Sequence, residues 1–511
     1  MGSGGFSVLL VLEELLKVVP PGLFLGETLG LIGLDRVLGG PLLLRRLLGT
    51  LLRRHAQERV RLDEIGEIYA RRHRITSRRR LAGLPNNRLA HDLPGYIATM
   101  AAGYLVGSPV RYAPPDGQED AFEAVRRAYG EASVESVDAE LAMDAAVYGK
   151  AVELCYADAL ARPRVAQMDP RSSFVVYDDT VEHAPLFGVA CRDLMDEQLR
   201  RRGERISVYG PHIIRHFERV GSETPREVGR QAHYFGGVPM VEYWNNAREQ
   251  GDFEPVMGLI DAYDALQSDR VNDKQQFTDA VFVLKGVGAL GVDDTEEETV
   301  DADGTATAAG AAGKEAEDPS VRLRRTRTLF LPGDGADAQF VTKPDAESGN
   351  ELLRMSLKSD IHKLCLVPDL TDEQFAGNVS GVAMRFKLLG LEQLTKIKER
   401  WFREGLRTRL RLFCAFLARK GTAALNAEKV QITFSRSLPV NDLEIAQTLA
   451  TYQGMVPEKL LLAQVPFVED AEAAGKLLNR ERAEAAGRQR EAFEITPFRK
   501  DAGEDDQGRE G

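Results

Sequence analysis

The chain has 511 residues, of which 43% are hydrophobic and 28% charged, as is typical of globular proteins rather than disordered or fibrous ones. Acidic residues outnumber basic ones by 78 to 66, and the net charge of −12 means that any contact with nucleic acid should be local or weak. The four cysteines are widely spaced without a CxxC pair, which argues against a zinc site or a disulfide framework and suits a reducing cytoplasm.

The first 60 residues are unusual because leucine dominates them while charges and Pro-Gly breaks interrupt every apolar run. None of these runs approaches the roughly 18 apolar residues of a membrane span. Residues 1–12 also lack the basic start of a secretory signal, so we predict no membrane segment. Two interpretations stay open: a segment that binds a membrane surface or a scaffold, and a family-specific extension that packs on neighbouring subunits or is partly disordered.

Amphipathic helices are predicted for most of residues 57–148. The first, over 57–75, is charged and ends in the basic run RRHRITSRRR, which can either contact nucleic acid or form an ion-pair patch between subunits. A second helix is predicted over 87–106, where Pro94 either bends it or sets its start. Helical periodicity returns over 121–148.

The pattern changes to short β-rich runs over residues 151–235, where Pro, Gly and Asp turns separate runs such as SFVVYDD and RISVYG. These runs predict a meander of antiparallel strands. Residues 253–285 return to a helix that ends in the strand-like AVFVLKG. The insert at 293–319 carries ten carboxylates and one lysine, too few apolar residues to build a core.

The segments that follow alternate again between strand and helix. Residues 321–332, VRLRRTRTLFLP, predict an arginine-rich strand. One further strand is predicted within 429–439, and helices are predicted over 442–454 and 469–493. The acidic, glycine-rich tail DAGEDDQGREG is predicted to be disordered.

The longest helical signal of the chain starts after a polar, glycine-bearing loop and continues to Lys420. Ser380 can cap its start, Gly421 can stop it, and Gly390 and Gly405 are candidate bends. A basic, solvated face is expected opposite its apolar residues. Those residues fall at steps of three to five and form one stripe: Leu388, Leu391, Leu394, Ile397, Trp401, Phe402, Leu406, Leu410, Phe413 and Leu417.

Four motifs look like chemistry, but none has the context that its mechanism requires. GVGALG at 286–291 has the letters of a dinucleotide fingerprint, yet acidic residues follow it where a helix N-terminus must bind the pyrophosphate. The GK pair at 313–314 has no following Ser or Thr. His212 and His216 lack an accompanying Glu or Cys, and GNVSG at 377–381 is not GxSxG. We therefore predict no catalytic residue, no metal site and no cofactor.

Three stretches resemble signatures of one family, in that family's order along the chain. They are PNNRLAHDLPGYIATMAAGYLVGSPVRY at 85–112, VEYWNNAREQGDFEPVMGLIDAYDALQSDRVNDKQQFTDAVFVLKG at 241–286 and VPDLTDEQFAGNVSGVAMRFKLLGLE at 367–392. The family is that of tailed-bacteriophage portal proteins, in its long-tailed phage branch, and the likeness covers roughly residues 65–495. The resemblance implies an α+β, mainly α, subunit that forms a ring, the head–tail connector at one capsid vertex.

The resemblance also implies how the chain divides into parts. They are an N-terminal extension of unknown role (1–60), a wing of helices and a β-meander (61–255), an outgoing stem helix (256–285), a clip with the acidic insert (286–341), a returning stem helix (342–367), a tunnel loop (368–386), a long helix with a wing strand (387–440), crown helices (441–495) and a disordered tail (496–511).

Two groups of residues are candidate sites in this layout. The polar tunnel loop is expected to face DNA, and the basic strand of the clip is expected to dock partners. The tunnel-loop candidates are Thr371, Gln374, Asn378, Ser380, Gly381 and Lys387, and the clip candidates are Arg322, Arg324, Arg325 and Arg327.

The function implied by the resemblance is structural and not enzymatic. It is a dodecameric conduit for packaging and ejecting double-stranded DNA without sequence specificity, made in the host cytoplasm and held in the virion at the portal vertex. Implied partners are other copies of the chain, the terminase packaging motor, a head–tail adaptor, the scaffold and the major capsid protein, with no membrane. Two alternatives stay open: an enzyme of phage DNA metabolism, such as a nuclease or nucleotide-binding protein, and a ring adaptor off the DNA path.

Overall fold

The structure is a computed structural model of the whole chain, and most of the predicted helices and strands can be compared with it. It describes residues 41–81, 84–221, 223–277, 281–285, 328–331, 337–341, 347–370, 384, 386–421, 425–436, 442–462, 464–465, 468 and 471–494.

The described residues form a mixed α+β fold, as the sequence predicts, and divide into two units. The larger unit holds every described strand. The smaller unit contains three helices, in which Arg482 pairs with Glu458 at 2.8 Å. These helices are α13 (Asp442–Tyr452), α14 (Glu458–Leu462) and α15 (Ala471–Glu494), and they confirm the two helices predicted there.

A five-stranded antiparallel sheet forms the part of the predicted meander that starts at residue 173, whereas the first two predicted runs, within 150–168, belong to a second sheet. The strands of the five-stranded sheet follow the order β4-β5-β6-β7-β8. Because side chains alternate along a strand, Phe174 and Val176 lie on one face of β4 and Val175 lies on the other. The strands are β4 (Ser173–Tyr177), β5 (Pro185–Met195), β6 (Arg201–Tyr209), β7 (Ile213–Arg219) and β8 (Arg226–Ala232).

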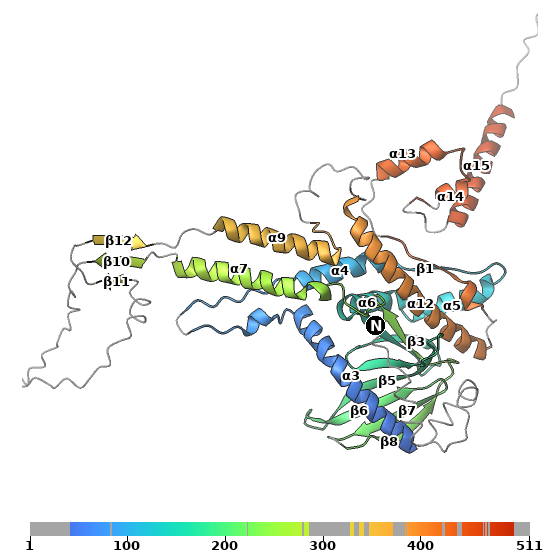
Figure 1. Ribbon diagram of the computed structural model, residues 1–511. Coiled ribbons are helices and arrows are strands. Elements are labelled where there is room, and N and C mark those ends of the chain that lie inside the picture. Colours follow the sequence, from blue (N-terminus) through green and yellow to red (C-terminus); the bar gives the residue numbers. More distant parts are fainter. Residues whose placement is uncertain are drawn as a thin grey trace, which may run out of the picture. The chain divides into compact units, whose positions relative to one another are not determined.

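Both faces of this sheet are covered. Helix α3 (Pro41–Tyr69) lies along one face, where Leu48 and Leu51 pack in a core with Phe174 (Figure 1). A three-stranded antiparallel sheet covers the other face, where Met240 packs in a core with Val175. Helix α3 continues without a break through residue 60. The second sheet has the order β3-β2-β9 and consists of β2 (Lys150–Ala157), β3 (Pro163–Met168) and β9 (Met240–Trp244).

Three helices precede the second sheet. Pro94 sets the start of the first rather than bending it, since it follows the N-cap Asp92, whose carboxylate accepts from the Gly95 N–H at 3.2 Å. Gly149 ends the third with a φ of 82°. The helices are α4 (Leu93–Val106), α5 (Glu119–Glu131) and α6 (Val134–Tyr148), so the helix predicted over 87–106 begins at Leu93 and the helical stretch predicted over 121–148 is divided between α5 and α6.

Two long helices, α7 and α9, lie side by side (Figure 1). Arg270 of α7 joins them because its guanidinium pairs with Glu351 of α9 at 3.1 Å and also with Glu347. The chain between these helices contains a small sheet in which β10 pairs in parallel with β11 and antiparallel with β12. The elements are α7 (Met257–Phe277), β10 (Val281–Lys285), β11 (Thr328–Leu331), β12 (Asp337–Val341) and α9 (Glu347–Cys365).

The longest helix is α12 (Leu389–Arg419), 31 residues that span about 45 Å. Gly421 follows it with a φ of 89°, which confirms the predicted stop. Gly405 lets the helix approach β9 closely, since a Cβ there would lie 2.3 Å from a carbon of the Tyr243 ring. After α12 in the chain, β13 (Gln431–Thr433) pairs with β1 (Arg111–Ala113). The short 3-10 helices are η1 (Arg74–Ser77), η2 (Glu254–Val256) and η3 (Ala427–Lys429).

Two details predicted for the long helix are wrong. The helix begins at Leu389 with Leu388 as its N-cap, so Ser380, outside the described residues, is not the cap of α12. Ile397 was expected in the apolar stripe but is 47% exposed. The next residue, Lys398, takes the inward position instead and is 1% exposed.

Candidate functional site

Two basic side chains of α12, Lys398 and Arg409, are buried on its apolar face. They are separated by three helical turns, which places them on the same side of the helix. Burying a charge is costly unless it is paired and hydrogen-bonded, so each must have partners. Those partners come from segments far away in the sequence.

Arg409 binds two buried carboxylates. Its Nε donates to Glu153 of β2 at 2.9 Å, and its Nη1 lies 2.7 Å from Asp138 Oδ1 of α6. The Tyr243 hydroxyl donates to the same Glu153 at 2.6 Å. Although burial opposes the charged form, Asp138 and Glu153 hold the pKa of Arg409 well above its usual value. Burial raises the pKa of Asp138 to about 6, against the opposing influence of Arg409.

Lys398 binds Asp252, which is also buried. Asp252 belongs to the segment that connects β9 to α7, and residues 245–254 are named the junction loop below. The Asn245 amide donates to the other oxygen of Asp252 at 2.8 Å. Asp252 therefore holds the junction loop to α12 with a charge-assisted bond on one oxygen and an amide on the other.

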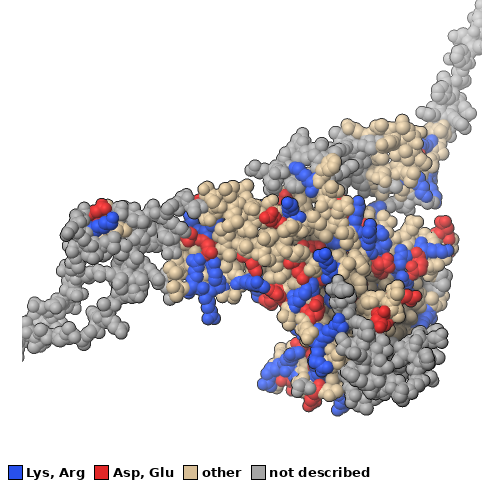
Figure 2. Space-filling view, in the orientation of Figure 1, with Lys and Arg blue, Asp and Glu red and all other residues tan. Residues whose placement is uncertain are grey.

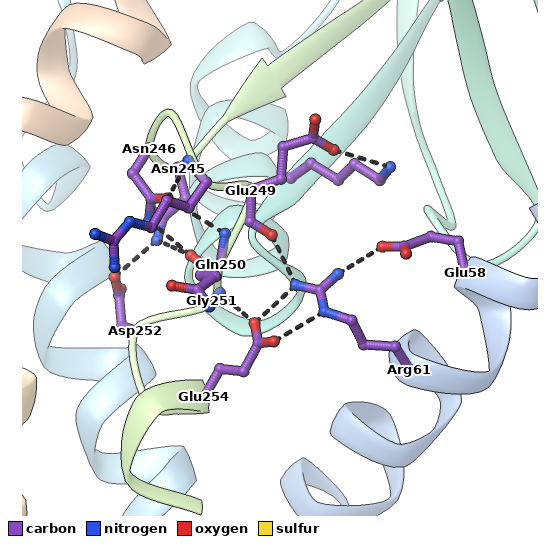
Figure 3. Close-up of polar contacts among 11 residues, drawn as sticks. Glu58, Arg61, Asn245, Asn246, Glu249, Gln250, Gly251, Asp252 and Glu254 are labelled. Carbon is purple, nitrogen blue, oxygen red and sulfur yellow. Dashed lines mark hydrogen bonds and ion pairs between the residues drawn. The ribbon is translucent and has the colours of Figure 1, made fainter. Parts of the chain in front are cut away.

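Hydrogen bonds within the junction loop hold its conformation (Figure 3), and a further hydrogen bond joins it to α6. The side chains of Asn245 and Asn246 both donate to the Gln250 carbonyl, at 2.9 and 2.8 Å. The Asp252 N–H donates to the Ala146 carbonyl at 2.7 Å. Gly251 is required there, because a Cβ would lie 2.2 Å from the Val147 carbonyl oxygen.

Helix α3 provides the third anchor of the junction loop. Arg61 donates from Nε and Nη2 to the two oxygens of Glu254 at 2.8 Å each, and from Nη2 to the Glu249 carbonyl at 2.7 Å (Figure 3). Glu58, one turn earlier on α3, holds the remaining side of the guanidinium. Bidentate pairing fixes orientation as well as distance, so the start of α7 is tied to α3.

A row of polar side chains on α7 binds the extended segment before α4. Asp264, Ser268 and Asn272 recur every four residues and are fully buried. Each accepts a backbone N–H of that segment: His91 at 3.0 Å, Leu89 at 2.9 Å and Asn87 at 2.7 Å, respectively. Two of the stretches quoted above, 85–112 and 241–286, therefore meet in one interface.

Asp264 also accepts from two histidines. The ring nitrogens of His73 and His91 lie 2.5 and 2.8 Å from its oxygens. Burial alone would raise the pKa of Asp264, but these hydrogen bonds lower it, and the Asp264 carboxylate in turn raises the pKa of His73 against the effect of burial. The trio holds η1 and the segment before α4 to one turn of α7.

Most predicted site residues lie outside the described part of the chain. This applies to Thr371, Gln374, Asn378, Ser380 and Gly381 of the loop and to Arg322, Arg324, Arg325 and Arg327 of the basic strand, as well as to the motifs at 286–291 and 313–314. Lys387 is described and half-buried, just before α12. His216 lies on β7 within 3.0 Å of the Ser207 hydroxyl.

Among the described residues, no group of three or more His, Cys, Asp or Glu is placed to hold a metal ion. None of the described helices is long and apolar enough to cross a bilayer. Ion pairs and hydrogen bonds join the junction loop to α12, α3 and α6, and the loop leads directly into α7.

The chain resembles phage portal proteins in sequence. A family model described as "Phage portal protein, SPP1 Gp6-like" matches residues 48–488. The portal protein of Clostridium phage phiCD119 is 26% identical over 249 residues, which is 48% of this chain and 49% of that protein. The portal protein of Bacillus phage SPP1 is 24% identical over 318 residues, 58% of this chain and 57% of that protein. The chain thus spans about half the length of the curated relatives it matches.

Proposed function

Because the chain belongs to the SPP1 Gp6-like family of phage portal proteins, we propose that it assembles into a dodecameric ring at one capsid vertex. The ring is the conduit through which double-stranded DNA is packaged and ejected. Its proposed partners are the terminase motor, a head–tail adaptor, the scaffold and the major capsid protein. The chain itself needs no cofactor and catalyses no reaction, since the motor provides the energy.

The observation that carries this proposal is an uncovered apolar stripe on α9. Leu352 is 70% exposed, Leu353 50% and Met355 56%. Figure 2 shows few charged atoms over this helix, although α7 beside it carries several. Exposed apolar side chains that gather on one helix indicate an interface. In a ring, the α7–α9 pair of one copy covers the stripe of the next.

The described elements fit the layout of a portal subunit. We propose that α7 and α9 are the outgoing and returning stem helices, that β10, β11 and β12 belong to the clip, and that the two covered sheets form the wing. Helices α13 to α15 are the proposed crown. The net charge of −12 supports free passage of DNA, because a mostly acidic lumen repels the duplex and keeps it mobile.

Ring assembly is the first expected result. The purified chain should form a closed oligomer of about twelve copies at micromolar concentration, visible as rings with a central channel in negative-stain images and measurable by native mass spectrometry. Replacing Leu352 and Met355 together by Ser should shift the population towards smaller oligomers, because burying the substituted surface between copies no longer gains hydrophobic free energy. As a control, Val60→Ser replaces an apolar residue of α3 that is 70% exposed, and it should leave the rings intact. A chain that stays monomeric or dimeric contradicts the proposal.

The tunnel loop is proposed to contact DNA through Asn378, Ser380 and Gly381, with Lys387 at its base. Deleting residues 378–381 should reduce DNA packaging or retention severalfold while rings still form, since a polar loop contributes little apolar burial. Packaged DNA per particle and ring yield are measured separately. Loss of rings in the deletion variant would show instead that the loop is a packing element.

A further inference from the structure

Residues 367–370 lead from α9 into the tunnel loop and are named the loop entry below. Val367 is fully buried, and its carbonyl accepts from Nδ1 of His362 on α9 at 2.9 Å. The Asp369 carboxylate pairs with Lys358, also on α9. Side chains of α9 therefore hold the first and third residues of the loop entry.

The second and fourth residues of the loop entry are bound by one hydroxyl of α4. The half-buried Tyr96 donates this hydroxyl to the Pro368 carbonyl at 2.9 Å, and the same oxygen accepts from the Leu370 N–H at 3.0 Å. A hydroxyl can donate and accept at once, so a single atom makes both bonds. The Tyr96 ring also lies edge-on to His362, with the ring centroids 5.8 Å apart. Tyr96 thus spans the loop entry and contacts the residue that holds Val367.

The chain on the far side of the tunnel loop returns to the end of α9. A Cβ on Gly390 of α12 would lie 3.4 Å from the Leu366 carbonyl oxygen, which is van der Waals contact. Leu366 itself has a φ of 61°, in the left-handed region that leucine rarely adopts. Such a conformation persists only where the surrounding structure imposes it. The contacts of the loop entry and of Gly390 therefore set the direction of the chain at this point.

A second tyrosine of α4 holds the return side of the loop, but there the binding is shared. Tyr104 lies about two turns after Tyr96 and donates its hydroxyl to Glu392 of α12 at 3.0 Å. Glu392 also pairs with Arg436 at 3.3 Å and with Lys396 at 3.5 Å. Loss of the Tyr104 hydroxyl leaves Glu392 with these two cations, whereas loss of the Tyr96 hydroxyl removes two bonds to the loop entry at once.

We propose that Tyr96 is a positioning residue, which fixes the direction in which the tunnel loop leaves the subunit and so where that loop meets DNA. The inference rests on the proposed function, in which the tunnel loop contacts the duplex. The observation that carries it is the pair of backbone bonds made by one hydroxyl. Because both bonds end on one atom of a helix, the loop entry cannot turn relative to α4 without breaking at least one of them.

Hydrogen–deuterium exchange on the purified full-length chain tests whether the hydroxyl holds the loop entry. In Tyr96→Phe the Leu370 N–H loses its acceptor, so a peptide that contains this amide should exchange roughly tenfold faster than in the parent chain. The phenyl ring keeps its contact with His362, and Leu370 is 37% exposed, so water can bind the freed N–H and the chain stays folded. Tyr104→Phe, the matched control on the same helix, should leave exchange at Leu370 unchanged. Parent-like exchange in Tyr96→Phe overturns the proposal.

DNA packaging by the same variants separates positioning from folding. Tyr96→Phe should package or retain severalfold less DNA per particle at an unchanged yield of rings, whereas Tyr104→Phe should behave like the parent chain. Unchanged packaging in Tyr96→Phe, loss of its rings, or an equal loss of packaging in both variants overturns the positioning role. If the parent chain itself packages no DNA, the proposed function fails; if the parent packages DNA and the two variants behave alike, this inference alone fails.

Discussion

Replacing Arg409 by Ala should destabilise the larger unit by about 3–5 kcal/mol, one of the largest effects expected in this protein. The substitution leaves Asp138 and Glu153, 4% and 0% exposed, facing each other without a cation. It also removes a large side chain that is fully buried in the core. Urea denaturation followed by circular dichroism, at matched protein concentration, measures the loss.

The pH dependence of this loss distinguishes charge from packing. Burial already raises the pKa of Asp138, and removing Arg409 takes away the charge that opposes this rise, so the folded state holds a proton that the unfolded state releases. Stability conferred by such a group is present at low pH and is lost as pH rises through the folded pKa. Arg409→Ala should therefore cost more at about pH 8 than at about pH 5. A cost independent of pH would assign the effect to packing.

The control for Arg409 is Arg411, half-exposed on the opposite side of the same helix, where it pairs with Glu428. Arg411→Ala should change the free energy of unfolding by about 0.5 kcal/mol or less, since surface ion pairs contribute little. If the two variants were equally destabilised, the buried position of Arg409 would not be the cause.

The elements of the fold were predictable from local patterns, and the buried charges were not. Periods of two and 3.6 residues identified the meander, α7 and most of the α12 stripe, because burial of one face imposes that spacing. Helix α9 was expected only from the family resemblance. Because the pattern counts lysine and arginine as polar, it places Lys398 and Arg409 on the solvent-facing side of α12. Their partners Asp252 and Glu153 lie 146 and 256 residues away, and no local pattern encodes such a pairing.

A usable signal for the buried charges does exist in the sequence. Lys398 and Arg409, like Thr395 and Gly405, stand at positions that belong to the apolar face of the helix. A helical projection that considers only the position of each residue, and not its type, therefore places them inward. The same is true of Asp264, Ser268 and Asn272 on α7, which repeat every four residues. The parallel pairing of β10 with β11 carries no comparable signal, since 42 residues separate Lys285 and Thr328.

Replacing Lys398 by Met should cost about 3–5 kcal/mol, because Asp252 is left as a buried carboxylate with one amide donor. Met has nearly the same length and volume, so the loss reports the charge rather than a cavity. The junction loop would lose its bond to α12 but keep those of Arg61 to Glu254. Thermal and urea denaturation give the magnitude.

The double variant decides what the pair does. A buried ion pair is weak evidence for stability, since replacing both partners by neutral groups of similar shape is often nearly neutral. Lys398→Met with Asp252→Asn should therefore recover at least about half of the loss, because the Asn side-chain oxygen can still accept from Asn245. If the double variant regains stability and still forms rings but packages less DNA, the pair serves to couple α12 to α7 during packaging. If stability, rings and packaging recover together, the pair serves only to fold the chain.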